Sequence, residues 1–330
     1  MKAGGVLVID LFSGPGGLSE GISSCVHENG NKPFQIGVSV EKEPSAHKTL
    51  TTRAFYRKIK ELPNGLNDYY DYVRSDITRD EIFTKYPNEY NEVLKETLEG
   101  PKALGDDNAL IHERIRMLAS EHQGPKVVIG GPPCQAYSLA GRSRNTGIKD
   151  YKVEKDHRNF LYREYLKVLS IAQPNVFVME NVKGMLSAKI NGKPIFDQIK
   201  ADLEDPSKTT NELTFNERKK QKYRIVPVIK SSIKDDLLSK DVDHFLPKDY
   251  IIKSENYGIP QKRHRVILLG LREDIADQWS NDLVLKSCKD PVSIKDVIDD
   301  LPKLRSGLSK LENTAYNWTK TIQDGAEEIH

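Results

Sequence analysis

The feature that most constrains the fold is a short apolar run that ends in a glycine-rich turn. Val6 to Phe12 form an apolar, partly β-branched run that only Asp10 interrupts, and Ser13-Gly14-Pro15-Gly16-Gly17 follows them. Leu18 to Val26 can continue from this turn as a helix. The order of strand, glycine turn and helix suits a nucleotide-like cofactor, because glycines let the backbone approach a ligand at the start of a helix. Taken alone, the turn is equally typical of a tight connection without a ligand.

Strands and helices alternate through much of the remaining chain. We expect strands at Gln35–Val40, Lys126–Gly130, Asn175–Glu180, Arg224–Ile229 and Arg265–Gly270, helices at Ser45–Phe55 and Arg158–Ala172, and a short helix capped by Ser293 that ends before Pro302. This alternation predicts a doubly wound, mostly parallel α/β sheet of the Rossmann-like type. Ligands of such a sheet bind at the carboxyl ends of its strands.

Composition limits the protein class without indicating a partner. The 330 residues can bury one large core, or one large and one small, and 37% hydrophobic with 30% charged residues indicates a soluble chain. Lys and Arg total 50 against 48 Asp and Glu, so the net charge of +2 does not indicate a nucleic-acid partner. The apolar run at the N-terminus is too short for a signal peptide or a membrane span, so we expect no membrane association.

The cysteines give a further limit. Cys25, Cys134 and Cys288 are odd in number and widely spaced, which fits neither a disulfide framework nor a zinc site with paired ligands. We therefore expect no bound metal and a reducing compartment, cytoplasmic or nucleoid-associated. Two stretches, near 85–123 and 202–249, carry little pattern and are interpreted as insertions or long loops.

Candidate chemical groups follow the predicted strands. Cys134 lies in Gly130-Gly131-Pro132-Pro133-Cys134-Gln135, where a rigid loop can hold a nucleophilic thiolate exposed. Glu180 ends a strand, and burial there would raise its pKa and fit it for proton donation. Arg263 and Arg265, which a period of two places on one strand face, suit phosphate or base contacts. Each group also has a structural interpretation: a small buried thiol, a loop-bound glutamate and a charged strand entrance.

Glu41 follows the second predicted strand. An acidic side chain at this point of a nucleotide-binding sheet accepts hydrogen bonds from ribose hydroxyls. The alternative is a surface glutamate that caps the next helix.

Taken in order, these segments resemble the motifs of the cytosine-C5 DNA methyltransferase family. The resemblance rests on DLFSGPGG, Glu41, GGPPCQAYS, DHRNFL at 156–161, MENVKGM and YGIPQKRHRV, and it extends to 302 if DDLP at 299–302 is included. It implies a Rossmann-like S-adenosylmethionine-dependent methyltransferase domain over residues 1–302, with the two insertions inside it and residues 303–330 as an extension. The implied function is cytosine-5 methylation of double-stranded DNA, of the bacterial restriction-modification type.

The resemblance also implies roles for named residues. Cys134 would add to cytosine C6 and make C5 nucleophilic, Glu180 would hold N3 and N4, Arg265 would bind O2, and Arg263 would orient the loop or a phosphate. The target base must leave the duplex stack to reach such a site. The residues implied at the cofactor, which leaves as S-adenosylhomocysteine, are Phe12, Ser13, Gly14, Gly16, Gly17, Glu41, Asp76, Ile77, Pro132 and Leu161.

Members of the family normally continue into a target-recognition domain and a final Gly-Asn motif, which residues 303–330 do not contain. We therefore expect a split enzyme completed by a second polypeptide, a truncated chain or a degenerate remnant, and little activity on DNA from this chain alone. Three other interpretations stay open: a transfer-RNA cytosine-5 methyltransferase, a non-catalytic cofactor- or DNA-binding subunit, and a dinucleotide-dependent oxidoreductase. The last departs from G-x-G-x-x-G spacing.

Overall fold

A computed structural model describes residues 5–133, 161–190, 193–209, 221–230, 245–280, 283–302 and 307–327. Its strands are β1 (Val6–Leu11), β2 (Phe34–Val40), β3 (Lys126–Gly130), β4 (Val176–Val182), β5 (Lys189–Ile190), β6 (Lys193–Pro194), β7 (Tyr223–Val226), β8 (Ile251–Lys253) and β9 (His264–Arg272). Seven of them form one sheet in the order β2-β1-β3-β4-β9-β7, with β8 also paired to β9. β2, β1, β3 and β4 run parallel, whereas β9 is antiparallel to β4, β7 and β8.

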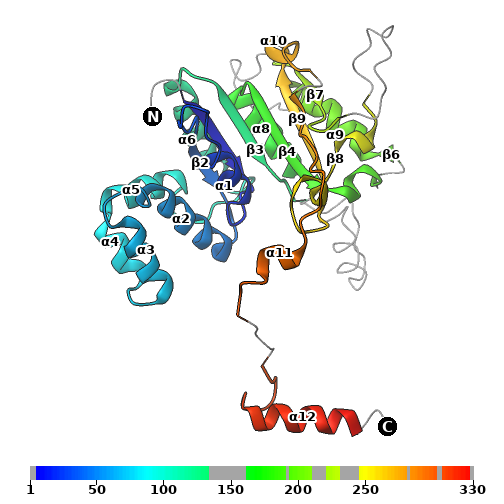
Figure 1. Cartoon of the computed structure of the whole chain (residues 1–330). Coiled ribbons are helices and arrows are strands. Elements are labelled where there is room, and N and C mark those ends of the chain that lie inside the picture. The colour runs from blue at the N-terminus through cyan, green and yellow to red at the C-terminus, as the bar shows by residue number, and fades with distance from the viewer. Residues whose placement is uncertain are drawn as a thin grey trace.

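The helices lie against this sheet and beside it (Figure 1). They are α1 (Gly17–Ser23), α2 (Pro44–Ile59), α3 (Gly65–Arg74), α4 (Arg79–Lys85), α5 (Pro87–Glu96), α6 (Asn108–Glu121), α8 (Leu161–Ala172), α9 (Ile195–Glu204), α10 (Glu273–Ala276), α11 (Ile294–Ile298) and α12 (Ala315–Glu327). Short 3-10 helices are η3 (Lys183–Leu186), η4 (Pro206–Thr209), η5 (Pro247–Tyr250) and η6 (Ser254–Tyr257).

Alternating side chains of β1 divide the core into two layers. Leu7, Ile9 and Leu11 belong to the large cluster that also contains residues of α6, α8 and α9. Val8 belongs to a smaller cluster on the other face, against which Ile22 of α1 packs. Because side chains of a strand alternate between its faces, Asp10 shares the second face with Val8.

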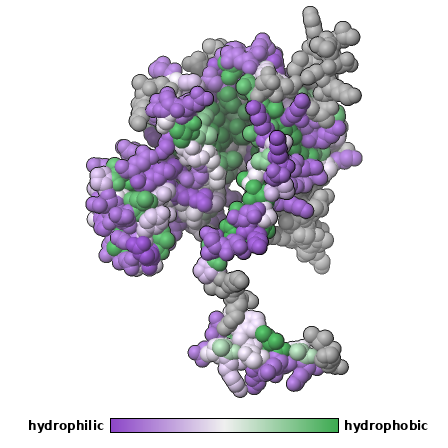
Figure 2. Space-filling model, viewed as in Figure 1, coloured by the Kyte–Doolittle hydropathy of each residue, from purple (hydrophilic) through white to green (hydrophobic). Residues whose placement is uncertain are grey.

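Helices α2 to α5 form a separate lobe with its own small core. Phe55, Phe83 and Val93 are buried there, and the Phe83 and Tyr90 rings stack with their centroids 4.1 Å apart. Figure 2 shows that polar side chains cover most of the visible surface of this lobe. The lobe follows β2 directly, so it lies beside the carboxyl ends of the strands.

The C-terminal elements are less buried. Ile294, Val297 and Ile298 of α11 and Tyr316 and Ile322 of α12 are all exposed. α12 lies apart from the α/β body in Figure 1. In the part of the chain that the structure describes, no helix is both long and apolar enough to span a bilayer.

The predicted fold class is confirmed, with differences in detail. The strand predicted at Lys126–Gly130 has those bounds, and Ser293 caps α11 by accepting a hydrogen bond from the Asp296 amide. β7 ends at Val226 rather than Ile229. The stretch near 85–123 contains helices α5 and α6, so its described residues are not a long loop.

Candidate active site

The carboxyl ends of β1, β2 and β3 open onto a cavity of about 730 Å³. It is lined by Phe12, Val40, Glu41, Lys42, Lys102, Ala103, Leu104, Gly105, Asp106, Gly131, Pro133, Leu161 and Glu164. This volume falls in the range of ligand pockets, roughly 300–1,000 Å³. The cavity therefore lies where a doubly wound sheet binds its ligands.

The glycine turn and Glu41 form one hydrogen-bonded unit at this edge. The Gly14 amide donates to Oε2 of Glu41 (2.7 Å), and the Glu43 amide donates to Oε1 (2.7 Å). The Ser13 amide donates to the Val40 carbonyl (3.0 Å), which ties the turn to the end of β2. Gly14 and Gly16 have φ of 54° and 90°, a region that favours glycine.

Of the predicted cofactor residues, three line the cavity and a fourth is hydrogen-bonded to one of those three. Phe12, Glu41 and Leu161 line the cavity, and Gly14 is hydrogen-bonded to Glu41. The other turn residues, Ser13, Gly16 and Gly17, lie in the same turn but not in the lining. Pro132 is buried beside the cavity, while its neighbour Pro133 lines it.

Asp76 and Ile77 lie elsewhere. Oδ2 of Asp76 accepts a hydrogen bond from Nε of Arg74 (3.1 Å), and Ile77 packs on the core of the α2–α5 lobe. Neither residue lines the cavity. The structure gives no geometric support at this cavity for the cofactor role predicted for them.

The wall formed by Lys102 to Asp106 was not predicted. The Lys102 amide donates to the Glu41 carbonyl (2.8 Å), so this segment is attached to the end of β2. Gly105 has φ of 103° and introduces the turn before α6. A signal was present in the sequence, because Gly105-Asp106-Asp107-Asn108 is a turn followed by a helix.

The start of the cysteine loop packs on the end of β4. Gly130 pairs with Met179, and Nδ2 of Asn181 donates to the Pro132 carbonyl (3.3 Å). A Cβ added at Gly131 would lie 2.8 Å from Oε2 of Glu180. Cys134 lies outside the described residues and directly follows Pro133 in the chain.

Glu180 and Arg265 meet across β4 and β9. Nε of Arg265 lies 2.7 Å from Oε1 of Glu180, as an ion pair rather than an aligned hydrogen bond, and the two side chains are 23% and 26% exposed. Nη1 of Arg265 donates to the His264 carbonyl (2.8 Å). Arg263 is exposed and precedes β9, so the alternation predicted for it with Arg265 does not apply.

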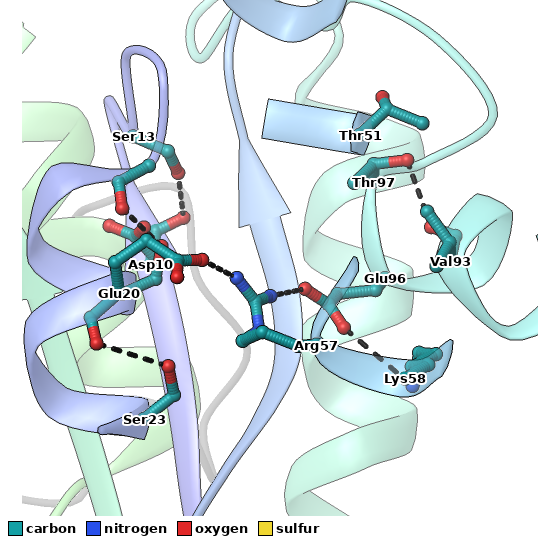
Figure 3. A network of polar contacts seen from close by, with 12 residues as sticks. Asp10, Ser13, Glu20, Ser23, Thr51, Arg57, Lys58, Val93, Glu96 and Thr97 are labelled. Carbon is teal, nitrogen blue, oxygen red and sulfur yellow. Dashed lines mark hydrogen bonds and ion pairs between the residues drawn. The ribbon is translucent and has the colours of Figure 1, made fainter. Parts of the chain in front are cut away.

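Beneath the glycine turn lies a buried acidic network (Figure 3). Asp10 is fully buried, and neither carboxylate oxygen has an aligned hydrogen-bond donor among the described residues. Burial raises the pKa of Asp10 to about 7, although the Ser19 and Ser13 hydroxyls and Arg57 lower it. Arg57 pairs with Glu20 and with Glu96 (2.5 Å), so one guanidinium joins α1, α2 and α5.

Taken together, the lining suits an organic cofactor with a ring and hydroxyl groups. Phe12, Leu161 and Pro133 offer apolar surface, and Glu41 offers carboxylate oxygens. Among the described residues, no three His, Cys, Asp or Glu side chains gather as metal ligands. The Glu180–Arg265 pair adjoins Gly131, which belongs to both the cavity and the cysteine loop.

Comparison with known proteins finds one family and several type II methyltransferases that are similar to this chain. The C-5 cytosine-specific DNA methylase family matches residues 82–206 and 232–330. The type II methyltransferase M.Bpa9945I of Bacillus paralicheniformis is 33% identical over 91% of this chain and 61% of its own length. M1.HphI of Haemophilus parahaemolyticus is 26% identical over 92% of this chain and 55% of its own length. M.AquIA of Picosynechococcus is 27% identical over 89% of this chain and 88% of its own length.

Proposed function

Because the chain belongs to the C-5 cytosine-specific DNA methylase family, we propose that it is the catalytic part of a DNA (cytosine-5) methyltransferase. The chain spans 61%, 39% and 55% of the lengths of M.Bpa9945I, M.BspRI and M1.HphI. The activity, substrate and partners of the whole protein are therefore part of the proposal. The observation that carries it is the Glu180–Arg265 pair, which lies against the loop that leads to Cys134.

We assign the cavity to S-adenosylmethionine, with S-adenosylhomocysteine as the product. The cavity volume of about 730 Å³ and its mixture of apolar and carboxylate lining fit this molecule. Phe12 and Leu161 would pack on the adenine, and Glu41 would accept hydrogen bonds from the ribose. When bound, the cofactor supplies the sulfonium methyl group that C5 of cytosine takes.

The protein's own chemistry begins at Cys134. Cytosine is too electron-poor at C5 to take a methyl group directly, so the Cys134 thiolate would form a bond to C6 and displace the C5–C6 π electrons toward C5. After methylation, loss of the C5 proton and cleavage of the sulfur–C6 bond restore the double bond and release the thiolate. The residue that accepts the C5 proton is not assigned.

Glu180 and Arg265 would hold the base during this addition. The Glu180 carboxylate can accept from N4 and share a proton with N3, which stabilises the electron-rich ring. Arg265 would donate to O2, and its ion pair with Glu180 fixes the two side chains relative to each other before a base arrives. The exposed Arg263 would contact a phosphate or the cysteine loop.

We propose double-stranded DNA as the substrate. A base inside the stack cannot reach the side chains of Glu180 and Arg265, so the cytosine must be extruded at a cost of a few kcal/mol. Target recognition would come from a second polypeptide or a further segment, and M.Bpa9945I and M1.HphI are both longer than the part that this chain matches. A weak rate from the isolated chain is the expected consequence.

The experiment is covalent capture on 5-fluorocytosine, whose fluorine cannot leave as a proton does. Stoichiometric chain, S-adenosylmethionine and random-sequence fluorinated duplexes are incubated long enough for a slow enzyme, and adducts are mapped by peptide mass spectrometry. We expect an adduct on Cys134 and none in Cys134→Ser. An unmodified wild-type chain, or an adduct that persists in the variant, contradicts the proposal. The same incubation is run with fluorinated transfer RNA, and capture on that RNA alone would replace DNA as the substrate.

A further inference from the structure

The unpredicted cavity wall is held in place by side chains that lie behind it. The Ala103 amide donates to Oδ2 of Asp107 (2.7 Å), and the Gly105 amide donates to Oδ1 of Asn108 (2.9 Å). These bonds fix the turn from within. A further side-chain hydrogen bond, from Nδ2 of Asn108 to Oε2 of Glu164 (2.8 Å), attaches the turn to α8.

The side-chain amide of Asn108 thus accepts one hydrogen bond and donates another. Its oxygen accepts from the wall backbone, and its nitrogen donates to a carboxylate. An aspartate in its place would keep the first bond and lose the second, because a carboxylate has no donor. The direction of the hydrogen bond to Glu164 is therefore defined, and paired substitutions can reverse it.

Glu164 is partnered at both oxygens. Oε2 accepts from Asn108, and Oε1 pairs with Nζ of Lys167 at 3.1 Å. The Glu164 and Lys167 side chains are only 14% and 17% exposed. Glu164 lines the cavity, and its hydrogen bond from Asn108 links α8 to the turn that forms the wall.

We propose that Asn108 and Glu164 are positioning residues that hold the wall from Lys102 to Asp106 in the shape that accepts the nucleoside part of the cofactor. This inference rests on the proposed function, which places S-adenosylmethionine in the cavity. The wall shares that cavity with Phe12 and Glu41, the residues assigned to adenine and ribose. Asn108 and Glu164 act by fixing this wall and do not contact the cofactor themselves.

The test reverses the hydrogen bond between the two side chains. Asn108→Asp places two carboxylates in contact, and we expect it to weaken calorimetric binding of S-adenosylhomocysteine by roughly tenfold. Glu164→Gln alone can still accept from Asn108 and should cost less. In the double variant the new amide at position 164 can donate to the new carboxylate at position 108, so affinity should return to within about threefold of wild type. Asn91→Asp, on the exposed surface of α5, is the control for the added charge.

Amide hydrogen exchange of the cofactor-free chain provides a second readout, which does not depend on the proposed function. Exchange at residues 103–107 should accelerate in Asn108→Asp and return to the wild-type rate in the double variant. Faster exchange with unchanged affinity would overturn the inference and leave the proposed function intact. A double variant weaker than either single variant would also overturn it, because Glu164 would then contact the ligand itself. A wild-type chain that binds no S-adenosylhomocysteine contradicts both.

Discussion

At the scale of single residues, Asp10 is a carboxylate in an apolar strand with no exposed surface. It lies near the end of the first strand, directly beneath the glycine turn, fully buried and next to Ser13 and Ser19. A buried carboxylate without donors is costly in its charged form. A protonated Asp10 can instead donate to one of the two hydroxyls, so the neutral acid suits this site.

The raised pKa of Asp10 gives a pH dependence of stability with a definite sign. Its ordinary value is 3.8, and burial raises it to about 7 in the folded protein. Between these values the folded state binds more protons than the unfolded chain, so stability falls as pH rises. The contribution is complete below pH 3.8 and is lost once pH exceeds about 7.

Asp10→Asn should remove this contribution, because an amide stays neutral at every pH. The free energy of unfolding of the variant minus that of wild type is therefore expected to increase by a few kcal/mol as pH rises from about 4 to about 8. Urea unfolding at several pH values measures the difference, and Glu96, whose pKa burial also raises, is present in both proteins and cancels. An equal difference between the two proteins at both ends of this range would contradict the account.

At the scale of elements, the site depends on how closely the ends of β3 and β4 approach. Gly131 leaves room for Glu180, and Asn181 is hydrogen-bonded to the Pro132 carbonyl. The Glu180 carboxylate therefore lies between the cysteine loop and Arg265 of β9. A side chain at position 131 would place its Cβ 2.8 Å from Oε2 of Glu180, so the carboxylate would have to shift.

Gly131→Ala is expected to slow methyl transfer by roughly 100-fold, the scale of effect that a displacement of about 1 Å can cause. A Cβ there would lie 2.8 Å from Glu180, whereas one at Gly100 meets nothing within 4 Å, which makes Gly100→Ala the matched control. Single-turnover transfer of labelled methyl groups to DNA measures the rate. A Gly131→Ala rate equal to that of the control would show that the contact with Glu180 does not matter.

Some strands and helices could be predicted from the sequence, and others could not. β1, β2, β3 and β4 were predictable because each is a short run rich in β-branched and other apolar residues that ends close to a glycine or a charged residue. In the α2–α5 lobe, α2 was predicted in part, at Ser45–Phe55. The helices α3 to α5 were harder to find, since the aromatic residues of the lobe pack on one another in a small core of their own. β8 was missed because three residues that pair only with β9 carry no periodic pattern.

At the scale of the whole molecule, the candidate site combines residues at strand ends, which the sequence predicted, with a cavity wall that it did not. Phe12, Glu41 and Glu180 lie at strand ends, and parallel strands place their carboxyl ends together, so their proximity followed from topology. The wall at Lys102 to Asp106 comes from a turn before α6, within the stretch near 85–123 that was interpreted as an insertion or long loop. The family resemblance implied Asp76 and Ile77 at the cofactor, and in the structure these two residues directly precede Thr78, which caps α4 with a capping box.

The central claim is that the cavity at this sheet edge binds the methyl donor, and calorimetric titration with S-adenosylhomocysteine tests it most directly. We predict one binding site per chain, with affinity lowered at least about tenfold by Glu41→Ala, which removes the carboxylate from both the cavity and the glycine turn. Asp76→Ala, outside the cavity, should leave the affinity within about twofold, below the loss of even a weak hydrogen bond. Absence of binding to wild type, or a loss caused by Asp76→Ala and not by Glu41→Ala, would contradict the account.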